Sequence, residues 1–179
     1  FEEIGAKPLK VYGLYGIGLV YQAKGDLDKA LDHYEKALKI REELSDKNGI
    51  GSSLNDIGNV YYDKGDYNIA LEYLEKSLSI QTEIGKKEPG LYTIVYLNLV
   101  YKQLNTEYNE KEIHSLIQDT ENIEYEINFR LYELLEDNSY LEAAYSQIQT
   151  IVDAMDDELK QKFLNYPIPK QIIQEWEGV

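Results

Sequence analysis

The stretch GNVYYDKGDYNIALEYLEKSLSI, residues 58 to 80, repeats the stretch GLVYQAKGDLDKALDHYEKALKI, residues 18 to 40. The two copies align without a gap, and identical residues lie forty positions apart, from Leu14 and Leu54 through to Glu43 and Glu83. The segments that begin at residues 1, 41 and 81 fall in the same register. A fixed period of this length is typical of a solenoid, in which each repeat is one supersecondary unit that shares its core with its neighbours.

Each copy predicts two helices joined by a short turn. Leu14, Ile17 and Tyr21 recur at helical spacing, so they form one apolar stripe of a first helix. In the KGD sequence that follows, Gly25 can take the left-handed conformation that ends a helix, and Asp26 can cap the next one with its side chain. A second helix is predicted by apolar residues at helical spacing, namely Leu27, Ala30, Leu31, Tyr34 and Leu38.

Small residues are predicted at the contact between the two helices of each copy. Gly18 lies on the first helix and Ala30 on the second, and Gly58 and Ala70 repeat them. Small side chains allow two helices to approach closely. Replacement of either glycine by leucine is therefore expected to overpack the contact.

The small residue on the first helix, Tyr21 or Tyr61, the KGD turn and the alanine on the second helix together resemble the tetratricopeptide repeat. The resemblance covers residues 11 to 84, and the period of forty is similar to a long variant of the repeat in bacterial multidomain signalling proteins. It implies an all-α fold, a right-handed α-solenoid of antiparallel helix pairs. It also implies that the first helix of each pair lines a concave groove, in which the repeat family binds protein partners.

Beyond residue 90 the repeat becomes degenerate. Asn98 stands where the first two copies have glycine, Asn105 replaces the turn glycine, and Glu110 replaces the buried alanine. We predict a single repeat domain over residues 1–179, with about four helix pairs and a C-terminal capping helix. Its predicted parts are the end of a preceding repeat (1–10), repeat 1 (11–50), repeat 2 (51–90), degenerate repeats 3 (91–121) and 4 (122–156), and the cap (157–179).

The charge and the cysteine content limit the classes of partner. There are 33 acidic and 18 basic side chains and a net charge of −15, which opposes binding to nucleic acid or to anionic membranes and favours a neutral or basic protein partner. The absence of cysteine excludes disulfides and thiolate metal sites and fits a reducing compartment, so we expect a cytoplasmic protein. Because Phe1 opens inside a repeat, we expect the C-terminal part of a larger signalling or regulatory protein.

Candidate catalytic groups all have simpler interpretations. His33 and His114 lack a second histidine or a carboxylate at ligand spacing. The sequence GLYGIG, residues 13 to 18, is neither preceded by a predicted strand nor followed by Gly-Lys-Ser/Thr, as a phosphate loop would be. The acidic run DAMDDE, residues 153 to 158, lacks the pattern of a calcium loop. We therefore predict no catalytic residue, no metal ligand and no cofactor.

The predicted site is the groove lined by first helices. Asn55 and Asn59 share one helical face, and paired asparagines at such positions resemble those that hold the backbone of an extended peptide in related arrays. The equally weighted alternative is that they cap local backbone or meet water. The predicted groove residues are Tyr12, Tyr15, Leu19, Asn55, Asn59, Tyr62, Tyr92, Val95, Leu99 and Lys102.

Two functions follow from the sequence. The first is a protein–protein interaction module that binds a peptide or helix in the groove. The alternative is an intramolecular regulatory or oligomerisation domain that packs on an upstream domain of its own chain or on a second copy. The basic clamp of chaperone-binding relatives is not matched, because Tyr15 and Leu19 stand where a lysine and an asparagine are needed.

Overall fold

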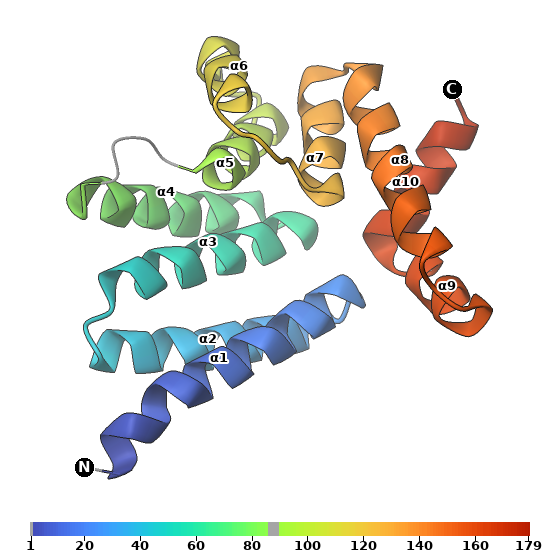
Figure 1. Cartoon of the computed structure of the whole chain (residues 1–179). Coiled ribbons are helices and arrows are strands. Elements are labelled where there is room, and N and C mark those ends of the chain that lie inside the picture. Colours follow the sequence, from blue (N-terminus) through green and yellow to red (C-terminus); the bar gives the residue numbers. More distant parts are fainter. Residues whose placement is uncertain (1, 86–89) are drawn as a thin grey trace. The chain divides into compact units, whose positions relative to one another are not determined.

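The computed structural model describes the backbone of residues 2–85 and 90–179 and the side chains of residues 7–85 and 90–179. This described part forms ten α-helices and no strand (Figure 1), which confirms the predicted all-α class. The helices are α1 (Glu2–Ala23), α2 (Leu27–Glu43), α3 (Lys47–Asp63), α4 (Tyr67–Glu83), α5 (Leu91–Gln103), α6 (Glu110–Gln118), α7 (Tyr125–Leu135), α8 (Asn138–Asp153), α9 (Asp157–Leu164) and α10 (Pro167–Glu177).

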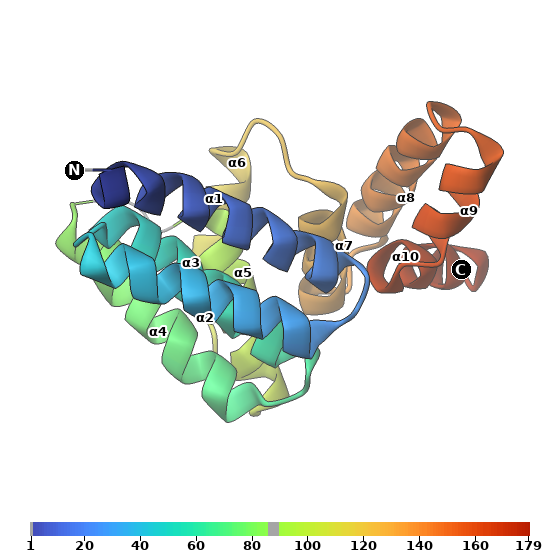
Figure 2. The same ribbon diagram turned by 90° about the horizontal axis from the view of Figure 1, so that it is seen from below.

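The chain divides into two compact units, residues 1–106 and residues 107–179, whereas the sequence predicted a single domain. In the first unit each of the helices α1 to α4 packs against the next helix along the chain, as Figure 2 shows for α1 to α4. This consecutive packing is the arrangement of an α-solenoid. In the second unit α7 packs against α8, and α8 packs against α10.

Two helices begin before the predicted repeat boundaries. The helix of the second repeat begins at Lys47 rather than after residue 50, because the Asp46 side chain caps it by accepting a hydrogen bond from Gly49 N at 3.0 Å. Residues 2–10, which were predicted as the end of a preceding repeat, belong to α1. The link at 86–89, and with it part of the predicted end of repeat 2, lies outside the described residues.

The KGD turns have the predicted backbone but not the predicted cap. Gly25 and Gly65 have φ values of 78° and 81°, in the left-handed region, and Asn105 takes their place in the third copy with φ 54°. Asp26 and Asp66 occupy the cap positions of α2 and α4, but neither side chain accepts a backbone hydrogen bond there. The Asp26 carboxylate instead forms an ion pair with Lys29, one turn into α2.

The core of the first unit lies between the helices of successive pairs. Ala30, Leu31 and Tyr34 of α2 pack with Ile57 and Val60 of α3, and all five are buried. The small residues predicted at the helix contact are confirmed as buried, but their neighbours differ: a Cβ atom on Gly18 would meet the ring of Tyr34, and one on Gly58 would meet Leu74. The residue one turn beyond the alanine therefore occupies the space that each glycine leaves open.

Ion pairs also follow the period of forty. Lys7 at the start of α1 forms an ion pair with Glu43 at the end of α2, with 2.7 Å between Nζ and Oε2. Lys47 and Glu83 form the equivalent pair between α3 and α4. Each pair joins the open ends of one helix hairpin, although exposed pairs of this kind contribute only about 0–1 kcal/mol to stability.

The second unit ends in the predicted cap. Phe163, Leu164 and Trp176 pack against a core that includes Leu141 and Ile148 of α8. Trp176 stacks on Tyr145 with 5.0 Å between ring centroids, so α10 covers one side of α8. Helix α8 is capped by Asp137, whose side chain accepts from Ser139 N at 2.9 Å.

Candidate interaction surface

Helices α1, α3 and α5 carry six of the ten predicted groove residues in two columns, because the period of forty places equivalent positions in the same register. The first column contains Tyr15, Asn55 and Val95, and the second contains Leu19, Asn59 and Leu99. Along each column burial increases from α1 to α5. Leu19 is 43% exposed, Asn59 is 6% exposed and Leu99 is 1% exposed.

The two asparagines of α3 are the unusual members of these columns. Asn55 and Asn59 lie one helical turn apart and are 9% and 6% exposed. Their Oδ1 atoms are buried, and within the described part of the chain neither has a hydrogen-bond partner. A buried amide oxygen without a partner is unfavourable by roughly 1–3 kcal/mol. Capping of local backbone, which was the alternative interpretation, is therefore not what the structure shows for these oxygens.

Asn98 of α5 behaves differently. It occupies the position of Gly18 and Gly58, and its Nδ2 donates to the carbonyl oxygen of Ile94 at 2.7 Å, one turn back in the same helix. Its amide is thus used locally. Among the described residues of α1, α3 and α5, the buried asparagine oxygens without a hydrogen-bond partner are those of Asn55 and Asn59.

Tyr15 is held in place by a polar network that the sequence did not predict. The pKa of its hydroxyl is raised to about 12 by burial, by the charge of the Asp56 carboxylate and by the hydrogen bond with Asp56. The Arg41 guanidinium lies over the Tyr15 ring, 5.4 Å from its centroid. Nη1 of Arg41 donates to the Gly49 carbonyl and to the Ser53 hydroxyl, each at 2.7 Å. Helix α2 therefore positions both α1 and α3 at this surface.

The other predicted groove residues divide into an exposed and a buried group. Tyr12, 71% exposed, and Tyr92, 38% exposed, are open to solvent, and Lys102 is half-buried. Tyr62 is buried, with its ring 5.6 Å from that of Tyr67. Val95 and Leu99 are also buried, which corrects their predicted exposure. The burial of Val95 and Leu99 could not be predicted from an amphipathic pattern, because every residue of α5 from 93 to 100 is buried and this part of the helix has no solvent-exposed face.

The candidate catalytic groups are parts of helices. His33 stacks on Tyr21 with 5.6 Å between centroids, and His114 is exposed on α6. Residues 13 to 18 lie within α1, which is not a phosphate loop. Among the side chains that the structure describes, no group of three or more histidines and carboxylates could hold a metal ion. None of the helices in residues 2–85 and 90–179 has the length and hydrophobicity of a membrane span.

The segment from residue 11 to residue 83 matches the family model of the tetratricopeptide repeat. That segment is similar to tetratricopeptide repeats. Their fold is shared by a putative kinesin light chain from Podospora anserina with nearly identical tetratricopeptide-like repeats, which is 17% identical to this chain with a TM-score of 0.52. That match covers 94% of this chain and 84% of the other, and at this identity it shows the fold alone. A search of curated proteins finds no match. Tetratricopeptide repeats generally mediate protein–protein interactions, and proteins built from them are typically scaffolds without enzymatic activity.

Proposed function

We propose that this protein binds a segment of a partner protein across the first helices of its repeats, with Asn55 and Asn59 holding the partner backbone. The observation that carries the proposal is the pair of buried, unpartnered Oδ1 atoms one turn apart on α3. Two acceptors at that spacing match the amide N–H groups of an extended or helical backbone, and each new hydrogen bond removes the cost of an unsatisfied oxygen.

The partner reaches these amides from the side of α1. Leu19 is exposed there, and Tyr12 is more exposed still, whereas Val95 and Leu99 on α5 are covered. Tyr12 and Tyr15 offer flat rings that bury a large area at low entropic cost, which suits apolar anchors of the partner. The bound segment therefore lies over α1 and α3 rather than along α5.

A neutral or basic segment fits the electrostatics. The net charge of −15 repels acidic chains and accelerates encounter with basic ones, an effect that salt screens. The free oxygens of Asn55 and Asn59 require donors, which the lysine and arginine side chains of a basic segment supply in addition to backbone N–H groups. The preferred ligand is thus a donor-rich segment with apolar anchors.

The proposal is tested with an array of synthetic twelve-residue peptides that combine leucine or tyrosine anchors with lysine and arginine, each paired with a version in which glutamate replaces the basic residues. We expect the full chain to capture members of the basic set and not their acidic versions. The double variant Asn55→Ala/Asn59→Ala is expected to bind the captured peptides roughly tenfold more weakly, since about 0.5–1.5 kcal/mol is lost with each hydrogen bond.

The double variant Asn48→Ala/Asn68→Ala is the matched control, because it removes two exposed asparagines from α3 and α4. It is expected to bind like the wild type. Circular dichroism and thermal unfolding show whether both variants are folded. Unchanged binding by a folded Asn55→Ala/Asn59→Ala variant, or capture of acidic peptides, would contradict the proposal.

A further inference from the structure

One face of α1 is exposed although the equivalent face of α3 is buried. Ile17 and Val20 are 45% and 51% exposed. Ile57 and Val60 occupy the same positions one repeat later, and both are completely buried. The residues are identical in the two repeats, so the difference lies in what covers them.

The structure shows what covers the face on α3. Ile57 and Val60 pack with Ala30, Leu31 and Tyr34, which all lie on α2, the second helix of the preceding pair. At the start of α3, Gly49 and Ser53 contact Arg41 near the end of the same helix. The covering helix therefore runs antiparallel to α3 along its whole length.

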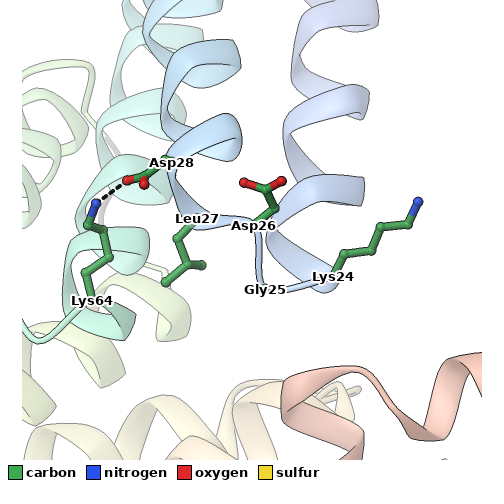
Figure 3. A pocket seen from close by; sticks show the side chains of 6 residues that line it. All are labelled: Lys24, Gly25, Asp26, Leu27, Asp28 and Lys64. Atoms are coloured by element: carbon green, nitrogen blue, oxygen red, sulfur yellow. Dashed lines mark hydrogen bonds and ion pairs between the residues drawn. The ribbon is translucent and has the colours of Figure 1, made fainter.

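An ion pair also joins α3 to the covering helix α2 at the end of this face. Lys64, at the end of α3, forms an ion pair with Asp28 in the first turn of α2 (Figure 3). Lys24 is the equivalent residue at the end of α1, and within the described part of the chain its side chain has no ion-pair or hydrogen-bond partner. In Figure 3 its side chain extends away from Asp28 and Lys64.

The exposed face of α1 is also smooth. Gly13 and Gly16, which stand in place of Ser53 and Asp56, have no atom within 4 Å of a Cβ built on either residue. Leu9, Gly13, Ile17 and Val20 follow one another at helical spacing and lead to Lys24. We refer to Leu9, Gly13, Gly16, Ile17, Val20 and Lys24 as the α1 face.

We propose that the α1 face docks the second helix of another tetratricopeptide-like helix pair, antiparallel to α1, as α2 docks on α3. That helix carries an acidic residue in its first turn, which pairs with Lys24. An Ala-Leu-x-x-Tyr segment follows two residues later and covers Ile17 and Val20. The partner is thus defined by the sequence pattern that α2 itself contains, from Asp28 to Tyr34.

A second copy of the chain does not offer such a helix. Its α2 is already covered by α3, and its α4 is covered by α5. Its α6, the second helix of the third pair, has no Ala-Leu-x-x-Tyr segment. In its second unit α8 is covered by α10, with Tyr145 stacked on Trp176. The surface is distinct from the peptide-binding surface proposed above, which is centred on Asn55 and Asn59, so the two proposals succeed or fail independently.

The test uses the absence of cysteine in the chain. Val20→Cys introduces a single thiol on the α1 face. An extended chain is made by placing an additional copy of residues 7–46 directly in front of Lys7, which preserves the period of forty and supplies an α2-type helix as the probe. The Val20→Cys substitution is made only in the original copy. We expect the reaction of this thiol with Ellman's reagent to be at least tenfold slower in the extended chain than in the original one.

Two matched cysteines calibrate the rates. Val60→Cys lies at the equivalent buried position and is expected to react slowly in both chains, whereas Ser79→Cys is exposed on α4 and is expected to react rapidly in both. In the extended chain that carries Val20→Cys, the additional change Lys24→Glu is expected to increase the reactivity of the introduced thiol severalfold. The same charge change at exposed Lys39 is expected to leave that reactivity unchanged.

Equal reactivity of the Val20→Cys thiol in the original and extended chains overturns the proposal. If the extended chain does not unfold cooperatively, a longer addition of two consecutive copies of residues 7–46 repeats the test with the same α2-type helix, and failure of both additions to fold also overturns the proposal. Analytical sedimentation of the original chain shows whether it is a monomer or a dimer. A dimer in which the Val20→Cys thiol is protected would identify a second copy as the occupant and exclude the proposed helix.

Discussion

The backbone of Gly58 in α3 lies directly against the side chain of Leu74 in α4: a Cβ atom built on the glycine would be 2.7 Å from Cγ of the leucine and 3.3 Å from its backbone nitrogen. Leu74 is completely buried, so it has little freedom to move away. The close contact of the helix hairpin therefore depends on the missing side chain at residue 58.

Gly58→Ala is expected to lower the free energy of unfolding. Overpacking costs about 1–3 kcal/mol, and the higher helix propensity of alanine offsets up to about 1 kcal/mol of this cost. Gly16→Ala is the matched control, because it makes the same change in a helix where no atom lies within 4 Å. It is expected to raise the free energy of unfolding by about 0.5–1 kcal/mol. Urea unfolding measures both, and equal shifts would show that the contact does not constrain residue 58.

Arg41→Ala is expected to destabilise the first unit. The guanidinium donates to the Gly49 carbonyl and to the Ser53 hydroxyl, and the substitution leaves both buried oxygens with one partner fewer, at a cost of about 1–3 kcal/mol. Lys39→Ala, on the exposed side of the same helix, is expected to change stability by no more than about 0.5 kcal/mol. The comparison is made by urea unfolding, and equal effects would exclude a structural role for the network.

Tyr15→Phe is expected to change how stability depends on alkaline pH. The pKa of Tyr15 is raised from 10.0 to about 12 in the folded chain, so its contribution to stability is complete below pH 10 and is lost as pH rises towards 12. Phenylalanine cannot ionise, so the Tyr15→Phe variant does not lose this contribution to stability when the pH rises. The measurement is the urea midpoint of both proteins at pH 8 and pH 11. The wild type is expected to lose more on going to pH 11, and identical losses would contradict the assignment.

Ser45→Gly is expected to stabilise the chain. Ser45 has φ 55°, in the left-handed region that costs a residue with a Cβ about 1–2 kcal/mol, and Gly85 occupies the equivalent position one repeat later. The reverse change, Gly65→Ser, forces serine to φ 81° and is expected to be destabilising by a similar amount. Thermal unfolding of the two variants gives opposite shifts if the turn conformations are as described.

Helix α6 is expected to open before α3 and α4. It is nine residues long and buries only Ile113 and Leu116, whereas α3 alone buries ten residues. Few buried contacts allow local opening at low free energy. Hydrogen exchange is therefore expected to be faster at residues 113–118 than at residues 57–62 and 70–77. Equal protection would place α6 in the same cooperative unit as the first four helices.

The repeat allowed most of the first unit to be predicted from the sequence. The helices, the left-handed glycines of the turns and the buried alanines could be predicted because the same residues occur at the same positions of both copies. The boundaries were less certain: apolar spacing does not show where α3 begins, and the capping Asp46 lies in a polar segment that looks like a linker. The two units of the chain were not predicted, since periodicity reports local helices and not the packing of distant ones.

The burial of the predicted groove residues and the polar contacts of Tyr15 could not be predicted from the sequence period. A period of forty places Tyr15, Asn55 and Val95 at equivalent positions of α1, α3 and α5, but it cannot show how deeply each side chain is buried. The cluster of Tyr15, Arg41 and Asp56 was missed because the three residues are far apart in sequence and do not recur: Asn55, Gln81 and Tyr96 stand forty residues later. A signal was nevertheless present, since Arg41 falls on the apolar side of α2, where Tyr34 and Ala37 are also buried.

The packing of each helix of the first unit on the next has a consequence for how the chain folds. Contacts between consecutive hairpins join residues that are close in sequence, and topologies of this kind fold rapidly because little loop entropy is lost before contacts form. Folding of a repeat array can also start at more than one hairpin. While the chain emerges from the ribosome, α1 and α2 can pair before α3 is complete, and the exposed core of α2 becomes the template on which α3 assembles.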